Sequence, residues 1–107
     1  PYPPHAPRSK VGAMHIGVFD SGIGGITVLN ELRRCLPRAR FTYLGDTANV
    51  PYGSKTPAVI RRLCRQALAQ LPERRSLDAL VVACNTASAV ALEDMRIYMH
   101  PVPVIDV

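Results

Sequence analysis

Residues 77–88 read LDALVVACNTAS, a pattern typical of a buried parallel strand that leads into a helix. The apolar run at 77–82 has the length of one strand, and residues 88–95 have a helical composition. Cys84 therefore lies between the end of a strand and the start of a helix. At such a position the free N–H groups and the helix dipole favour a thiolate over a thiol. The simpler alternative is a buried cysteine that only packs.

A second stretch, FDSGIGG at residues 19–25, follows an apolar strand at 16–19 in the same way. Its glycines allow a tight turn or the close approach of a ligand. The sequence predicts further strands at 41–44, 80–83 and 101–107, and helices at 26–36, after Thr56 and at 88–99. This alternation predicts an α/β three-layer sandwich with a parallel four-stranded sheet. For so short a chain we expect the flavodoxin-like strand order 2-1-3-4.

Polar side chains follow the two central strands of this predicted sheet. Asp20 and Ser21 come after the first strand, and Cys84, Asn85 and Thr86 come after the third. Ligands of such sheets bind outside the carboxyl ends of the strands, where the connections leave in opposite directions. We therefore expect a carboxylate and a thiol across one small crevice. Its rim is predicted to come from the loop after the second strand, with Asp46, Thr47, Tyr52 and Gly53.

Composition narrows the class of protein. The 107 residues carry a net charge of +5 and are 48% hydrophobic, which suits one domain with its own core. No apolar run is long enough to cross a membrane, and the arginines are scattered rather than clustered with aromatic residues, so we expect neither a membrane nor a nucleic acid as partner. Three cysteines without a C-x-x-C pair predict neither disulfides nor a zinc site, and favour the cytoplasm. The proline-rich residues 1–14 are expected to be a disordered leader.

Three familiar uses of such a crevice fit the residues poorly. A dinucleotide-binding site requires the motif G-x-G-x-x-G, but residues 22–27 read GIGGIT. The negatively charged Asp20 would also face the pyrophosphate of the ligand. A cysteine phosphatase wants an arginine six residues after its nucleophile, where this chain has Val90. A Cys–His pair needs a histidine in these loops, and all three histidines lie elsewhere in the sequence. What remains is a cysteine that carries a proton near a carboxylate.

Three motifs in order resemble the amino-terminal half of bacterial glutamate racemase, in the aspartate/glutamate racemase family. They are IGVFDSGIGG at 16–25, GDTA with PYG at 45–53, and VVACNTASA at 81–89. The resemblance covers residues 15–107 and implies one lobe of a two-lobed fold. It also implies an isomerase of the cytoplasm that interconverts L- and D-glutamate by cysteine acid–base chemistry, without cofactor or metal. D-Glutamate made in this way supplies peptidoglycan for the cell wall and cell shape, and the full-length family is expected to form homo-oligomers.

The resemblance also implies roles for individual residues. Cys84 would be one of two catalytic cysteines, with Asp20 close enough to assist its thiol. The substrate glutamate would be held by Asp20, Ser21, Tyr52, Gly53, Asn85 and Thr86. Racemisation needs a base on one face of the α-carbon and an acid on the other, held in a dry site.

The 107 residues lack one part of the family pattern, a second lobe with its own cysteine in a Thr-x-x-Cys-Thr-His-type motif. Cys35 and Cys64 are predicted to lie on helices, packed in apolar surroundings, so Cys84 is expected to be the reactive thiol. The chain is therefore expected to be a truncated racemase lobe that is inactive alone. Two alternatives stay open: a single-cysteine decarboxylase or isomerase of the same superfamily, and a non-catalytic interaction fragment.

Overall fold

The computed structural model describes residues 14–22 and 24–107. All but the last residue of the predicted leader at 1–14 lies outside the described residues. The strands are β1 (His15–Asp20), β2 (Arg40–Gly45), β3 (Ala79–Val82) and β4 (Val104–Asp106). The α-helices are α2 (Ile26–Cys35), α3 (Pro57–Ala69) and α4 (Asn85–Met99). Short 3-10 helices lie in the connections: η1 (Thr47–Asn49), η2 (Tyr52–Ser54) and η3 (Arg74–Ser76).

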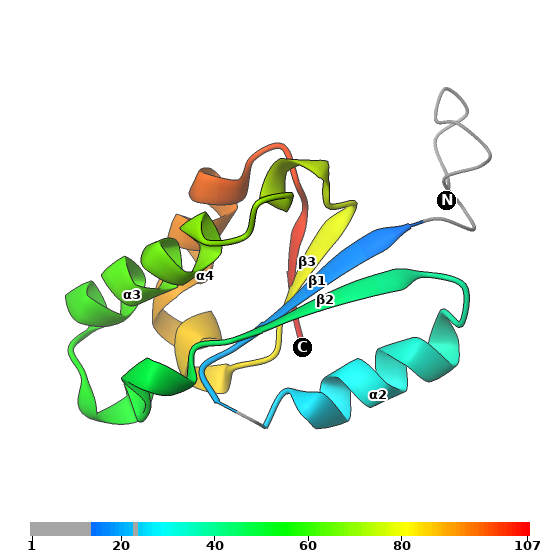
Figure 1. Ribbon diagram of the computed structural model, residues 1–107. Coiled ribbons are helices and arrows are strands. Elements are labelled where there is room, and N and C mark those ends of the chain that lie inside the picture. The colour runs from blue at the N-terminus through cyan, green and yellow to red at the C-terminus, as the bar shows by residue number, and fades with distance from the viewer. Residues whose placement is uncertain (1–13, 23) are drawn as a thin grey trace.

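The four strands form one parallel sheet in the order β2-β1-β3-β4, which confirms the predicted order. The central strand β1 pairs on one side with β2, where Phe19 is opposite Leu44. On its other side β1 pairs with β3, where Phe19 is opposite Val82. The loops that follow β1 and β3 therefore leave the sheet side by side, at its carboxyl edge (Figure 1).

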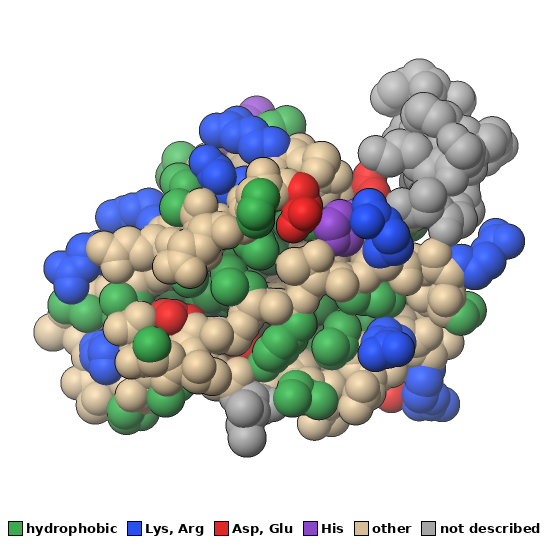
Figure 2. Space-filling view, viewed as in Figure 1, with side chains coloured by type: hydrophobic (Ala, Val, Ile, Leu, Met, Phe, Trp, Pro, Cys, Tyr) green, Lys and Arg blue, Asp and Glu red, His purple; other side chains and the backbone are tan. Residues whose placement is uncertain are grey.

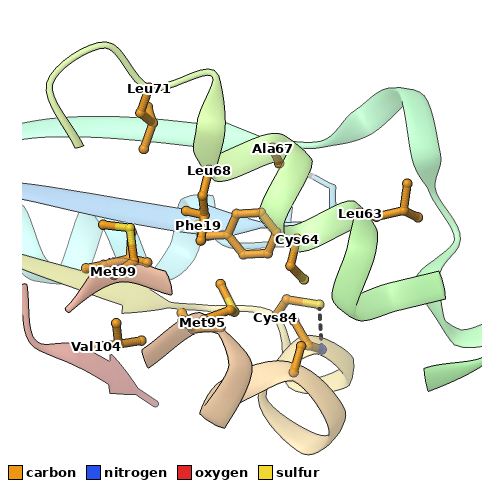
Figure 3. Close-up of a cluster of buried hydrophobic side chains, with 14 of the residues drawn as sticks. Phe19, Leu63, Cys64, Ala67, Leu68, Leu71, Cys84, Met95, Met99 and Val104 are labelled. Carbon is orange, nitrogen blue, oxygen red and sulfur yellow. Dashed lines mark hydrogen bonds between the residues drawn. The ribbon is translucent and has the colours of Figure 1, made fainter. Parts of the chain in front are cut away.

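Helices cover both faces of the sheet, as the three-layer prediction requires. One face packs against α2, where Val28, Leu29 and Leu32 contact a small cluster made by Ile16, Val18 and Val81. The other face packs against α3 and α4, which lie together on that side in Figure 1. The larger core lies between these two helices and the sheet, and Figure 3 shows part of it. Because strand residues alternate between the faces, Phe19 points into the larger core while Val18 points toward α2.

Helix α3 forms where the sequence pattern predicts it. Thr56 caps its amino end, with Oγ1 accepting the N–H of Val59 at 3.3 Å, and Pro57 occupies the first turn. One stripe of the helix is buried against the core, made of Ile60, Leu63, Cys64, Ala67 and Leu68. On the opposite side Arg61, Arg62, Arg65 and Gln66 are exposed.

Two predicted details of the helices are wrong. Helix α4 begins at Asn85 rather than at residue 88, because Cys84 itself occupies the capping position. The inner residues of α2 are only partly buried, and Cys35 in its last turn is exposed. Cys35 continues the inner stripe after Leu32, but it lines a surface hollow with Leu36 and Ala39, so solvent reaches the thiol. The expectation that Cys35 is packed in apolar surroundings therefore fails.

The surface has two general features. Figure 2 shows the Lys and Arg side chains of one face spread over several parts of the surface instead of forming one patch. Among the described residues, no helix combines the length and the apolar character needed to cross a membrane.

Candidate active site at the carboxyl edge of the sheet

The loops after β1 and β3 meet at the carboxyl edge of the sheet. The N–H of Ala83 donates to the carbonyl oxygen of Phe19 at 2.8 Å, which extends the strand pairing up to the two loops. Just beyond this bond, one residue after Ala83 and two residues after Phe19, the thiol of Cys84 lies 3.3 Å from the hydroxyl oxygen of Ser21. The predicted meeting of these two loops is therefore observed, and Ser21 of the first loop contacts the thiol.

Cys84 caps the amino end of α4. Its Sγ accepts the backbone N–H of Ala87 at 3.4 Å, the contact dashed in Figure 3. The residue is only 6% exposed, and its side chain lies among the core residues of the α3–α4 side. The thiol is thus held between a hydroxyl group and a helix N–H, and both can donate a hydrogen bond to a sulfur anion. The dipole of α4 acts in the same direction.

Asp20 is buried beside the start of α2. Its Oδ2 accepts the N–H of Gly25 at 2.7 Å and lies 3.4 Å from the hydroxyl of Tyr43, and the residue is 5% exposed. A Cβ added to Gly25 would lie 2.8 Å from the Cβ of Asp20 and 3.2 Å from the Cβ of Ala83. The Asp20 carboxylate therefore holds its own loop against α2, and Gly25 lies between Asp20 and Ala83, the residue that follows β3.

The loop after β2 forms a third side of the site. The N–H of Asp46 donates to the carbonyl oxygen of Asp20 at 2.9 Å, which ties this loop to the first. The carboxylate of Asp46 accepts the hydroxyl of Tyr52 at 2.6 Å and the side-chain amide of Asn49 at 3.0 Å. Tyr52 is 2% exposed, and burial, followed by its hydrogen bond to Asp46, raises the pKa of its hydroxyl above the usual range. Its side chain is therefore a core anchor of this loop.

The remaining candidate residues lie nearer to solvent. Gly53 is exposed, and a Cβ added there would meet no atom within 4 Å. In the first turn of α4, Asn85 is exposed and Thr86 is half-buried. Thr47 is exposed in η1. Within the described residues, no group of three or more His, Cys, Asp or Glu side chains has a spacing suited to a metal ion.

Comparison with known proteins gives the same family in sequence and in fold. The glutamate racemase of Thermus thermophilus is 58% identical over 80 residues, which cover 75% of this chain and 31% of the relative. That of Deinococcus radiodurans is 55% identical over 85% of this chain and 30% of the relative. The structure of the Francisella tularensis glutamate racemase in complex with D-glutamate superposes with a TM-score of 0.82 and 40% identity, over 89% of this chain and 36% of that one. No family model matches the sequence.

In sequence and in fold, this chain matches the glutamate racemases. The resemblance recognised from three motifs is thereby confirmed. A second solved relative, the glutamate racemase from Aquifex pyrophilus, superposes with a TM-score of 0.80 at 45% identity. The chain spans about one third of the length of the glutamate racemases that it matches, from 30% to 36% in these comparisons.

Two features of this glutamate racemase homologue were missed by sequence reasoning. Tyr43 was predicted only as a residue of the second strand, but its hydroxyl contacts Asp20 and Gly22. Cys64 was predicted only as a packing residue and is indeed fully buried, but Figure 3 shows its thiol directed toward Cys84. Burial first, and then the nearby Cys84, raise the pKa of Cys64 to about 12. Neither contact has a local sequence signal, because each depends on how separate elements pack.

Proposed function

We propose that this chain provides one catalytic face of a glutamate racemase, with Cys84 as the proton carrier. The observation that carries the proposal is the double contact of the Cys84 thiol, with the Ser21 hydroxyl at 3.3 Å and the Ala87 N–H at 3.4 Å. Both groups can stabilise a thiolate, which is the form that removes a proton. Similarity to glutamate racemases, one of them solved with D-glutamate, supports glutamate as the substrate.

In the proposed reaction, the Cys84 thiolate takes the proton from the α-carbon of glutamate and becomes a thiol. The electron pair of the broken C–H bond stays on the α-carbon. A second acid then returns a proton to the opposite face, which inverts the carbon, and the reverse reaction exchanges the two roles. The resemblance implies that this second acid is a cysteine of a second lobe. We propose residues 15–107 as the amino-terminal lobe and a reaction that uses neither cofactor nor metal.

The substrate is proposed to lie across the mouth of the two loops. Asn85 and Thr86 lie in the first turn of α4, where free N–H groups favour a carboxylate. Ser21 lies on the facing loop. The Tyr52 side chain is buried, so we propose that the backbone of residues 52 and 53 contacts the substrate, with open space at Gly53. Asp20 is proposed to act mainly by shaping its loop, because its carboxylate is engaged by Gly25 and Tyr43.

The wider setting is proposed from the family. D-Glutamate made by such an enzyme supplies peptidoglycan, which links the activity to the cell wall and to cell shape. All three cysteines are free, which supports a reducing compartment and hence the cytoplasm. We also propose a homo-oligomer for the complete enzyme, with the small-molecule substrate as its ligand.

The test joins residues 15–107 to the carboxyl-terminal lobe of the Thermus thermophilus relative. The hybrid should racemise L-glutamate, measured by circular dichroism and by exchange of the α-hydrogen in D₂O. The 107-residue chain alone should show no measurable turnover, since each missing acid–base group lowers the rate by about 10²–10⁴-fold. Cys84→Ser should abolish the activity of the hybrid.

The matched control is Cys35→Ser, because Cys35 is exposed and far from the site in sequence and fold. This variant of the hybrid should keep its activity. An active Cys84→Ser hybrid would contradict the role given to Cys84. Turnover by the 107-residue chain alone would instead favour chemistry with a single cysteine.

A further inference from the structure

The hydroxyl of Tyr43 lies between the last residue of β1 and the loop that follows this strand. It donates to the carbonyl oxygen of Gly22 at 2.6 Å and lies 3.4 Å from Oδ2 of Asp20. Asp20 and Gly22 are the two chain neighbours of Ser21, whose hydroxyl contacts the Cys84 thiol at 3.3 Å. A single phenol on β2 thus contacts the loop on both sides of the residue that meets the thiol.

Strand β2 is shaped to bring the phenol to this loop. Tyr43 and Gly45 are two residues apart, so they lie on the same face of the sheet. A Cβ added to Gly45 would lie 3.0 Å from the carbonyl oxygen of Gly22 and 3.1 Å from Cε2 of Tyr43. Glycine at position 45 therefore leaves the space in which the phenol and the Gly22 carbonyl meet.

We infer that Tyr43 is a positioning residue for Cys84, because its hydroxyl holds the Gly22 carbonyl on one side of Ser21 and lies beside the Asp20 carboxylate on the other, and so orients the Ser21 hydroxyl toward the thiol. The inference rests on the proposed function only for the role of Cys84. Tyr43 itself does not touch the thiol. Burial, followed by the charge of Asp20 and the hydrogen bond to Asp20, raises the pKa of Tyr43. The phenol therefore keeps the proton that it donates to the Gly22 carbonyl.

The test is a titration of Cys84 in the 107-residue chain, followed by NMR of ¹³Cβ-labelled cysteine. Tyr43→Phe removes the phenol hydroxyl, so the Ser21 hydroxyl should no longer be held toward the thiol. The loss of this hydrogen bond to the thiolate should move the midpoint of the Cys84 titration upward by about 0.5–1 pH unit. Ser21→Ala should give a similar shift, and the double variant should shift no further than Ser21→Ala alone. Two other titratable groups near the thiol, Cys64 on α3 and Tyr52 in η2, have pKa values that are raised mainly by burial.

The control is Tyr98→Phe, which removes a phenol hydroxyl from the far part of α4 and should leave the Cys84 midpoint unchanged. A purely structural Tyr43 would lower the melting temperature of Tyr43→Phe without moving the midpoint, and that result would overturn the inference. In the unaltered chain, a Tyr43 ring that titrates at its ordinary 10.0 would overturn it as well. The titration of Cys84 does not depend on turnover. An inactive hybrid enzyme would therefore refute the proposed function without affecting the result of the titration.

Discussion

Gly25 is the residue on which the packing of the two loops at the candidate site depends. Its backbone φ of −72° and ψ of −9° are open to every amino acid, so conformation does not demand glycine here. Space does, because a Cβ would lie 2.8 Å from the Cβ of Asp20 and 3.2 Å from the Cβ of Ala83. The absent side chain lets the N–H of residue 25 reach the Asp20 carboxylate at 2.7 Å. The start of α2 thereby fixes the loop that carries Ser21.

Gly25→Ala should therefore lower the free energy of unfolding by about 1–3 kcal/mol, as overpacking of a filled site does. Urea denaturation of the 107-residue chain measures the change. The matched control is Gly53→Ala, where the added methyl group meets no atom within 4 Å. Its effect should stay within about 0.5 kcal/mol. Equal losses in the two variants would contradict the account of Gly25.

At the scale of elements, α3 and α4 begin with different capping groups. Thr56 caps α3 through a hydroxyl oxygen, as sequence patterns lead one to expect. Cys84 caps α4 through sulfur, which is a weak hydrogen-bond acceptor. A cap chosen for helix stability alone would be Ser, Thr, Asp or Asn. The choice of cysteine at the start of α4 is thus better explained by its chemistry than by helix stability.

Thr56→Ala should lower the free energy of unfolding by about 1 kcal/mol, because the N–H of Val59 loses its acceptor. Chemical denaturation followed by circular dichroism detects a change of this size. Thr27→Ala on the exposed side of α2 is the control, since it removes a threonine that does not cap a helix. If Thr56→Ala were as stable as the original chain, the cap would have no role in forming α3.

At the scale of the whole molecule, the larger core contains a titratable thiol that must stay neutral. Cys64 is fully buried, and burial raises its pKa from 9.0 to about 12. Between these two values the unfolded chain loses the thiol proton while the folded chain keeps it. The contribution of Cys64 to stability is therefore complete below about pH 9 and is lost as the pH rises toward about 12.

The free energy of unfolding should accordingly fall above about pH 9, by up to about 1.4 kcal/mol per pH unit for this thiol. Urea denaturation at several pH values gives the slope. Cys64→Ala should make the slope shallower, whatever it does to stability at neutral pH. Cys35→Ala, at an exposed thiol, should leave the slope unchanged. Identical slopes in the original chain and in Cys64→Ala would show that Cys64 ionises freely in the folded state.

The sequence by itself determined the strand order, the resemblance to glutamate racemases and the meeting of the loops after β1 and β3. The alternation of apolar strands and helices limits a short chain to few parallel topologies, and order 2-1-3-4 then brings Ser21 and Cys84 to the same edge. Helix α3 was equally predictable, because its cap and its apolar period are local signals. The three motifs were enough to recognise the glutamate racemases.

Only the tertiary structure decided which side chains of these loops meet. The strand order places the two loops side by side. The direction of each side chain in them depends in addition on the pleat of the strand and on local packing. The Asp20 carboxylate accepts the N–H of Gly25 at the start of α2, whereas the Ser21 hydroxyl contacts the thiol. The contacts of Tyr43 with Gly22, and of Tyr52 with Asp46, likewise join loops through side chains whose directions no sequence period encodes. The exposure of Cys35 also depends on tertiary structure. The last turn of α2 lies beside a surface hollow, which the sequence of the helix does not predict.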